Sequence, residues 1–155
     1  MTASQDSIRL AGIAARAADE KNAGNIAAID VSDVMAISDV FVICSADNER
    51  QVRSIVDEVE DALTAEGKEP LRREGNRENR WVLLDYGGLV VHVQRDKERD
   101  FYGLDRLYRD CPLVEIEGLP EPERPGQWGD EIDPRVAESV EDLPLIAEEP
   151  DAGEL

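Results

Sequence analysis

The chain has 155 residues, of which 36 are acidic and 17 basic, so its formal net charge is −19. This length allows one domain with a substantial core and some chain left over. The negative charge argues against binding along a nucleic-acid backbone, which basic proteins usually do, and favours a basic protein partner.

Composition also limits the chemistry and the compartment. The sequence has one histidine and two cysteines, and the cysteines, Cys44 and Cys111, lie far apart and match no metal-ligand spacing. No stretch approaches the ~20 apolar residues of a membrane span, and the N-terminus has no apolar segment typical of a signal peptide. We therefore expect a cytoplasmic protein without a membrane contact.

The first part of the chain predicts a helix followed by two strands. Residues 4–21 are rich in alanine, and their apolar positions recur at helical spacing. Residues 25–31 predict a first strand and residues 39–44 a second. The second strand is short and almost wholly apolar, as expected of a strand buried on both faces of a sheet.

An amphipathic helix follows, for which Ser45, Asp47 or Asn48 can serve as the N-cap. Gly67 is placed to end it. Its apolar stripe has the spacing i, i+3, i+4, i+7 and i+11 and consists of Val52, Ile55, Val56, Val59 and Leu63.

Three further elements complete the predicted domain. Residues 70–74 predict a strand, residues 81–93 a β-hairpin, and residues 98–108 a shorter helix. The order of elements predicts an α/β (mixed α+β) fold, in which a mixed sheet of about five strands has helices packed on it.

The hairpin has a defined register if Gly87 and Gly88 are its two turn residues. Side chains alternate across each strand, so one face is a core face with Val82, Leu84, Tyr86, Leu89, Val91 and Val93. The other face is half apolar and half polar and carries Trp81, Leu83, Asp85, Val90, His92 and Gln94. A mixed face with a tryptophan is typical of protein-binding surfaces. A three-residue loop would instead move Trp81 to the more apolar face and His92 to the other.

The C-terminal part of the chain has a different composition. Residues 117–155 hold 13 acidic and 2 basic residues and six of the eight prolines. Such a segment buries too little apolar surface to offset its chain entropy. We therefore expect a folded domain over residues 1–116 and a largely disordered acidic tail over residues 117–155. A purely solubilising tail is the simplest interpretation, and the alternative is that Trp128, which is exposed by default, docks on the domain or on a partner.

The sequence offers little for catalysis. His92 has no nucleophile motif with it, and no phosphate-binding glycine motif is present. Asp30 and Asp33 lie where a strand ends, a position at which carboxylates can hold magnesium, although Asp33 more simply caps the following turn. We expect no enzymatic activity, no metal and no cofactor.

A small basic group beside Trp81 is the one candidate for RNA binding. It consists of Arg72, Arg73, Arg77 and Arg80. Glu74 and Glu78 interleave with these arginines, and the rest of the domain is acidic, so we expect no sequence-specific nucleic-acid binding.

Taken together, several segments resemble the ribosomal silencing factors (RsfS), the family related to the plant protein Iojap. The resemblance covers roughly residues 5–112 and leaves the tail unaccounted for. It is carried by Ile29-Asp30-Val31, Ser38-Asp39-Val40-Phe41-Val42-Ile43-Cys44, Arg50-Gln51-Val52, Glu74-Gly75, Trp81-Val82-Leu83-Leu84-Asp85-Tyr86-Gly87, Val90-Val91-His92-Val93 and Arg99-Asp100-Phe101-Tyr102-Gly103-Leu104-Asp105-Arg106-Leu107-Tyr108.

The resemblance implies a protein that docks on the large ribosomal subunit, on its fourteenth protein, and obstructs joining of the small subunit. Translation would thereby fall when nutrients are short. The implied fold is similar to that of nucleotidyltransferases, but the paired metal-binding aspartates and the Gly-Ser motif of those enzymes are not evident. The alternatives are a large-subunit assembly factor without silencing activity and a magnesium-dependent nucleotidyltransferase that uses Asp30 and Asp33.

On this interpretation the hairpin carries the binding site. The residues that we expect to contact the partner are Trp81, Leu83, Asp85, Tyr86 and His92. Trp81 would be the buried anchor and Asp85 the partner of a lysine or arginine. The alternative for Trp81 is packing beneath the last helix, against Phe101 or Leu104. A homodimer is also expected, because an apolar sheet face can pair with its own copy.

Overall fold

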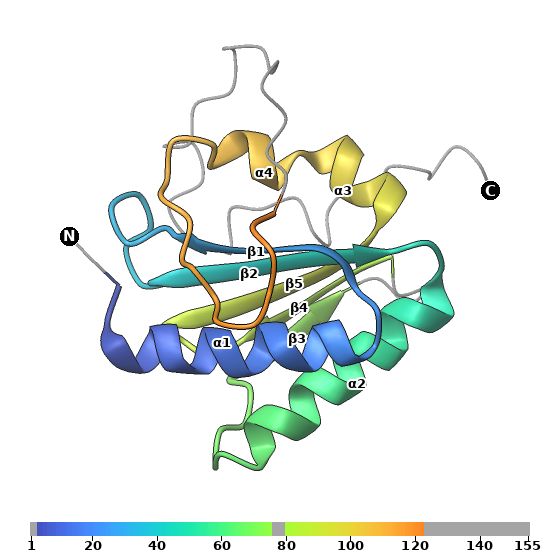
Figure 1. Ribbon diagram of the computed structural model, residues 1–155, viewed down its shortest axis with the longest axis horizontal. Helices are drawn as coiled ribbons and strands as arrows, with labels where there is room; N and C mark the ends of the chain where they lie inside the picture. The colour runs from blue at the N-terminus through green and yellow to red at the C-terminus, as the bar shows by residue number, and fades with distance from the viewer. Residues whose placement is uncertain (1–2, 76–79, 123–155) are drawn as a thin grey trace.

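The computed structural model of the chain describes residues 3–75 and 80–122 (Figure 1). The elements in chain order are α1 (Gln5–Glu20), β1 (Gly24–Asp30), β2 (Val40–Ala46), α2 (Glu49–Thr64), β3 (Arg72–Gly75), β4 (Trp81–Asp85), β5 (Leu89–Arg95), α3 (Asp96–Tyr102) and α4 (Leu104–Leu107).

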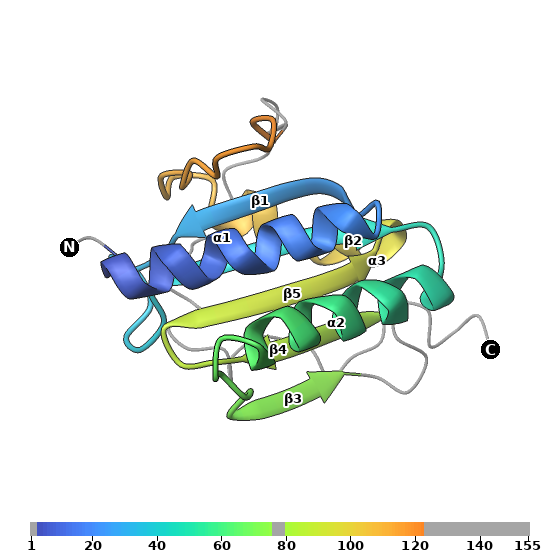
Figure 2. The ribbon, with the colours of Figure 1, turned by 60° about the horizontal axis from the view of Figure 1, so that its bottom comes forward.

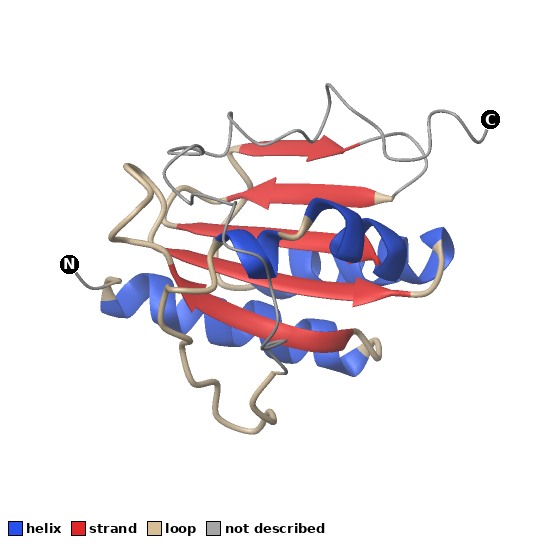
Figure 3. Cartoon of the chain, turned by 90° about the horizontal axis from the view of Figure 1, so that it is seen from above, coloured by secondary structure: helices blue, strands red, loops and turns tan. Residues whose placement is uncertain are grey.

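The five strands form one mixed sheet in the order β1-β2-β5-β4-β3. Only β2 and β5 run parallel, and the other three neighbouring pairs are antiparallel. Helices α1 and α2 lie side by side across one face (Figure 2), and α3 and α4 cover the other (Figure 3). The predicted mixed α/β fold is thus confirmed, with a hydrophobic core on each side of the sheet.

The two long helices form where their caps and apolar stripes predict them. The side chain of Ser4 accepts a hydrogen bond from the Ser7 N–H at 3.1 Å and caps α1. Of the three candidate caps for α2, Asn48 is the one used, accepting from the Gln51 N–H at 2.9 Å. All five residues of the predicted α2 stripe are buried against the sheet.

Strand β2 is buried along its whole length, as its apolar sequence predicts. It lies between β1 and β5, so its backbone is hydrogen-bonded on both edges, and a layer of helices covers each of its faces. This position makes β2 the central element to which both cores attach.

The β4–β5 hairpin has the register predicted from a two-residue turn, with Trp81 opposite Gln94 and Asp85 opposite Val90. Gly87 has a φ of +90°, the conformation that a primed turn requires at its first position. Gly88 is needed for a different reason. A Cβ at that position would collide with the Ser7 hydroxyl of α1, so the hairpin turn packs directly against the first helix.

The single helix predicted over residues 98–108 is wrong. The chain forms two short helices, α3 and α4, because Gly103 adopts a left-handed conformation with φ of +65° between them. The first of them also begins earlier, at Asp96, where its first-turn acidic residues favour a helix N-terminus.

Beyond α4, residues 112–122 run back along the outer edge of β1; we call this segment the strap. The Asp30 N–H donates to the Pro112 carbonyl at 2.8 Å, and the Val114 N–H donates to the Ala28 carbonyl at 2.7 Å. The strap therefore covers part of one edge of the sheet. The predicted boundary at residue 116 stays a prediction. The part of the predicted disordered tail from residue 123 onward, with Trp128, lies outside the described residues.

In residues 3–75 and 80–122, every helix is too short or too polar to cross a lipid bilayer.

Candidate partner-binding site

Trp81 lies inside the molecule. Its side chain is 1% exposed and belongs to the core between the sheet and α3–α4, together with Leu83 and Leu104. Its ring centre is 4.7 Å from that of Tyr102. The expectation of an open face around Trp81 is therefore wrong, because α3 and α4 cover that face. The alternative, packing beneath the last helix, is the arrangement observed, with Tyr102 in the place proposed for Phe101.

His92 is fully buried beside Trp81. Its Nδ1 accepts a hydrogen bond from the indole N–H of Trp81 at 3.2 Å. The proton of the neutral ring is then on Nε2, which has no hydrogen-bond partner among the described residues. Burial lowers the pKa of His92 to about 3, and the nearby Asp105 carboxylate only partly opposes this shift. His92 is thus a neutral, structural histidine in the folded chain.

Two arginines attach α3 to the sheet. The guanidinium of Arg95, at the end of β5, binds both carboxylate oxygens of Glu98, at 2.7 and 2.5 Å. Arg95 also reaches Glu49 at the start of α2, at 2.8 Å. Because Glu98 is fully buried, this bidentate pair fixes the first turn of α3 to the core.

Arg99 makes the second attachment. It binds both carboxylate oxygens of Asp105 in α4, at 2.8 and 2.9 Å. It also donates to the Gly24 carbonyl and the Ser45 hydroxyl at the ends of β1 and β2. The helices that cover Trp81 are consequently held by charge-assisted hydrogen bonds to three strands.

The hairpin turn presents a different environment, in which Asp85 is partly exposed. One carboxylate oxygen accepts a hydrogen bond from the Gly87 N–H at 2.8 Å, and the other lies 3.5 Å from Nε of Arg72 on β3. Asp85 therefore stabilises the turn and places a negative charge at the surface beside one arginine.

Tyr86 and Leu71 flank Asp85. Tyr86 is half-buried, and its hydroxyl has no hydrogen-bond partner in the described part of the chain. Burial, assisted by the negative charges of Glu60 and Glu69, raises the pKa of Tyr86 well above its ordinary value, so the phenol stays protonated. Leu71, which comes just before β3, is 74% exposed.

Five residues meet around the hairpin turn at the end of the sheet, with the ring of Tyr86 packed partly against the core on the α1–α2 side; we call them the hairpin-tip surface. It consists of Leu71, Arg72, Asp85, Tyr86 and Gly87. It combines an exposed apolar side chain, an aromatic ring and a carboxylate, the combination that protein-binding sites use. Of the five residues predicted to bind a partner, only Asp85 and Tyr86 belong to it, because Trp81, Leu83 and His92 are buried.

Among the described residues, three large apolar side chains are exposed that were not predicted as part of any site: Ile37, Leu71 and Phe101. Leu71 is followed by charged residues and gave no periodic signal. Phe101, which only the alternative for Trp81 placed in the core, is 58% exposed on α3. The ring of Phe101 lies 5.0 Å from that of Tyr102, which in turn contacts Trp81. An apolar residue isolated among charged ones is the signal that could have identified Leu71.

Two of the four arginines considered for RNA binding are engaged with carboxylates. Arg72 pairs with Glu74 and Asp85, and Arg73 pairs with Glu60 at 2.8 Å. Arg80 is buried, and Arg77 lies outside the described residues. The described members of this group therefore do not form a basic surface for a phosphate backbone.

The carboxylate of Asp30 is engaged by hydrogen bonds from neighbouring residues. The Asp30 carboxylate accepts hydrogen bonds from the Ser32 N–H at 3.0 Å, the Ser32 hydroxyl at 2.6 Å and the Ala3 N–H at 3.1 Å. Burial opposes its ionisation, but these hydrogen bonds outweigh burial and lower the pKa of Asp30. Within the described ranges, no three acidic, histidine or cysteine side chains converge as a metal would need.

Comparison with known proteins points to one family. The family model "Ribosomal silencing factor during starvation" (RsfS) matches residues 4–141. A protein of Halalkalibacterium halodurans named ribosomal silencing factor RsfS is 39% identical over 107 residues, which are 69% of this chain and 92% of that protein. The Bacillus subtilis protein of the same name is 39% identical over 105 residues, 68% of this chain and 89% of that protein. The chloroplast protein Iojap of Arabidopsis thaliana is 29% identical over 112 residues, 72% of this chain and 46% of that protein.

Solved structures show the same fold. A crystal structure of a Bacillus halodurans protein superposes with a TM-score of 0.61 at 35% identity and covers 73% of this chain and all of that one. A Chromobacterium violaceum protein superposes with a TM-score of 0.63 at 27% identity, over 65% of this chain and 84% of that one.

Proposed function

The chain belongs to the RsfS family of ribosomal silencing factors, and we propose that it binds the large ribosomal subunit and sterically blocks association with the small subunit. The proposed contact on the subunit is its fourteenth protein. The family membership is the observation that carries this proposal. The resulting decrease in joined ribosomes would repress translation in the cytoplasm.

The charge of the chain supports a basic ribosomal protein as the partner. The formal net charge is −19, and residues 1–116 alone contribute 23 acidic against 15 basic residues. Complementary charge accelerates the encounter of two proteins and disfavours wrong partners more than it raises final affinity.

We propose the hairpin-tip surface as the contact. Asp85 would pair with a lysine or arginine of the partner, while Tyr86 and Leu71 would bury apolar area around that pair. Trp81, Leu83 and His92 would support the hairpin from beneath rather than touch the partner, because their side chains are in the core. This division of roles keeps the predicted site on the hairpin and moves its centre from Trp81 to Asp85.

A binding role without catalysis is part of the same proposal. The relatives are named as silencing factors, and the hydrogen bonds of Asp30 leave its carboxylate committed to Ser32 and Ala3. A magnesium-dependent nucleotidyltransferase would need such carboxylates directed at a shared cation.

Sedimentation with purified subunits tests the proposal. We expect the full-length protein to comigrate with the large subunit in a sucrose gradient and to remain at the top when mixed with the small subunit alone. Protein that remains at the top with both subunits would contradict the proposal. Comigration with the large subunit while the joined-ribosome peak stays unchanged would favour the assembly-factor alternative.

A further inference from the structure

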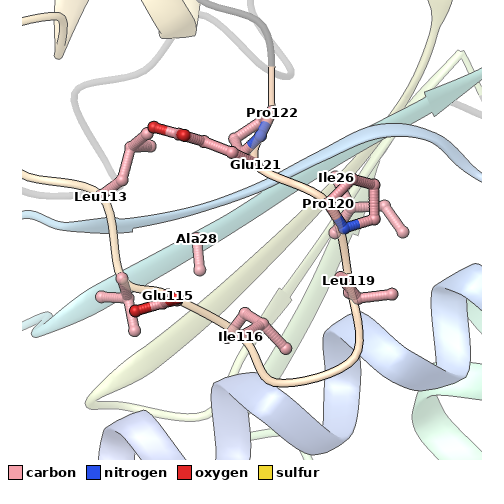
Figure 4. Close-up of a pocket in the computed structure, with 10 residues that line it drawn as sticks. Ile26, Ala28, Leu113, Glu115, Ile116, Leu119, Pro120, Glu121 and Pro122 are labelled. Atoms are coloured by element: carbon pink, nitrogen blue, oxygen red, sulfur yellow. The ribbon is translucent and has the colours of Figure 1, made fainter.

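A groove lies between β1 and the strap, at the edge of the sheet opposite β3 (Figure 4). Its volume is about 310 Å³. The side chains that line it come from β1 on one side and from the strap on the other, and most are apolar: Ile26, Ala28, Leu113, Ile116, Leu119 and Pro120.

The walls of the groove are fixed in place. Hydrogen bonds join the start of the strap to β1, through Pro112 to Asp30 and through Val114 to Ala28. Farther along, Ile116 and Leu119 pack against the core beneath α1, and Arg16 of α1 donates to the Glu117 carbonyl at 3.4 Å. The groove is therefore preformed, with mostly apolar side chains in its walls and polar atoms exposed among them.

The size of the groove limits what it can hold. Its volume is at the lower end of the roughly 300–1,000 Å³ of small-molecule sites, and it has no convergent set of polar side chains such as those sites use for orientation. One large aromatic or aliphatic side chain with its neighbouring backbone is a better match. The chemistry of the groove thus favours a peptide segment over a metabolite.

The chain itself supplies such a segment. Pro122, the last described residue, lines the groove, and residues 123–155 follow it. Trp128 lies six residues after Pro122, and an extended chain of that length reaches up to about 20 Å. Since the linker is short, the effective concentration of Trp128 at the groove is in the millimolar range, well above that of a separate molecule.

Charge selects this part of the tail over the rest. Glu115 and Glu121 lie at the groove, so an acidic segment would be repelled. Residues 125–129 (Pro-Gly-Gln-Trp-Gly) carry no charge, whereas residues 130–133 include three carboxylates. Trp128 also has an indole N–H that can donate to a glutamate while its ring is buried.

We propose that Trp128 docks in the groove between β1 and the strap of its own chain. The strap already covers part of the β1 edge, and the uncharged residues 125–129 would cover more of it. The acidic residues that follow would then project from this edge of the sheet, away from the hairpin-tip surface at the end of β4.

Tryptophan fluorescence tests the docking on the full chain, which has only two tryptophans. Trp81 is buried, so any fluorescence that a quencher in solution can reach comes from Trp128. With acrylamide, a neutral quencher, we expect weak quenching of both tryptophans in the wild type. Leu119→Glu, which places a charge in the groove, should produce a strongly quenched component that is absent when Trp128→Phe is added. Leu71→Glu, the same change at the opposite edge of the sheet, should leave quenching weak.

Two results would overturn the proposal. One is a Trp128 that is quenched in the wild type as strongly as in a synthetic peptide of residues 123–155. The other is protection that disappears on dilution, because a second copy would then supply the tryptophan. The emission of Trp81 in the Trp128→Phe background reports whether Leu119→Glu still folds; if it does not, Ile26→Gln replaces it in the same comparison.

Discussion

Asp85 has two roles: it stabilises the hairpin turn, and it carries the charge proposed to bind the partner. Its Oδ1 accepts the Gly87 N–H, and its charge lies near Arg72 at the surface. Asp85→Asn retains an oxygen for the turn and removes only the charge. We expect this variant to fold normally and to bind the large subunit about tenfold more weakly, since a charged contact in an interface contributes on the order of 1–2 kcal/mol or more.

Asp57→Asn is the matched control for this change. It removes the same charge from an exposed position on α2 that is not part of the hairpin-tip surface. Equilibrium binding of both variants to purified large subunits separates a local contact from the general field. Equal weakening by the two substitutions would mean that Asp85 contributes only to the overall charge.

His92 makes the free energy of unfolding depend on pH, over the range between its pKa in the folded chain and its pKa in the unfolded chain. Its pKa is about 3 in the folded chain and near 6.5 when unfolded, so the unfolded state binds the additional proton. Stability is therefore complete above pH 6.5 and falls as the pH decreases below it. Between pH 7 and pH 5.5 we expect a loss of about 1 kcal/mol in the free energy of unfolding.

Urea denaturation at the two pH values measures this loss. The sequence has no other histidine, so His92→Gln should largely remove the dependence while leaving an acceptor for the Trp81 indole. An unchanged pH dependence in His92→Gln would show that another group is responsible.

Among the elements, the hairpin turn depends on Gly88 because of α1. A side chain there would displace the Ser7 hydroxyl, which itself donates to Asp39 at 3.0 Å. We expect Gly88→Ala to lower the free energy of unfolding by about 1–3 kcal/mol, the usual cost of overpacking. Gly24→Ala is the control, because a Cβ at Gly24 meets only an ordinary contact at 3.5 Å. Similar thermal midpoints for the two variants would contradict the proposed clash.

The attachment of α3 can be tested on a single arginine. Arg95 binds the fully buried Glu98 and the partly exposed Glu49. Removing one member of a buried pair leaves an uncompensated charge, so Glu98→Gln should cost about 3 kcal/mol. Glu49→Gln should cost less, about 1 kcal/mol, because water reaches the Glu49 carboxylate and screens this pair. Equal effects in chemical denaturation would rule out the anchoring role of Glu98.

The sequence was sufficient for the elements that have strong patterns. The apolar run of β2, the stripe of α2 and the glycine pair of the hairpin each determine one local structure, and the hairpin register was predicted correctly. The covering of the second sheet face could not be read in the same way. Helices α3 and α4 are only one or two turns long, and they are tied to distant parts of the chain through contacts of Arg95 with Glu49 and of Arg99 with the backbone of β1 and the Ser45 hydroxyl.

The candidate site was predicted in part for the same reason. Alternation along β4 placed Trp81 and Asp85 on one face, which the register confirms. Their different exposure depends on how far α3 extends along that face, and no local pattern encodes this. The covered end of the face became core around Trp81, and the uncovered end became the surface at Asp85.

For the whole molecule, the two edges of the sheet differ in a way that bears on assembly. The strap bonds to part of the β1 edge, whereas β3 is the terminal strand at the other edge, next to Leu71. A terminal strand beside an exposed apolar side chain is suited to pairing with another chain. The predicted homodimer remains a prediction. A second copy paired at this edge would compete with the partner for the hairpin-tip surface.

The most direct test of the proposed function is light scattering during association of purified large and small subunits. With the protein at or above the concentration of large subunits, we expect the amplitude of joining to fall, and adding the protein to the small subunit first should have no greater effect. Asp85→Asn should require a higher concentration for the same inhibition, and Asp57→Asn should not. Joining that proceeds to full amplitude while the protein is bound to the large subunit would contradict steric silencing.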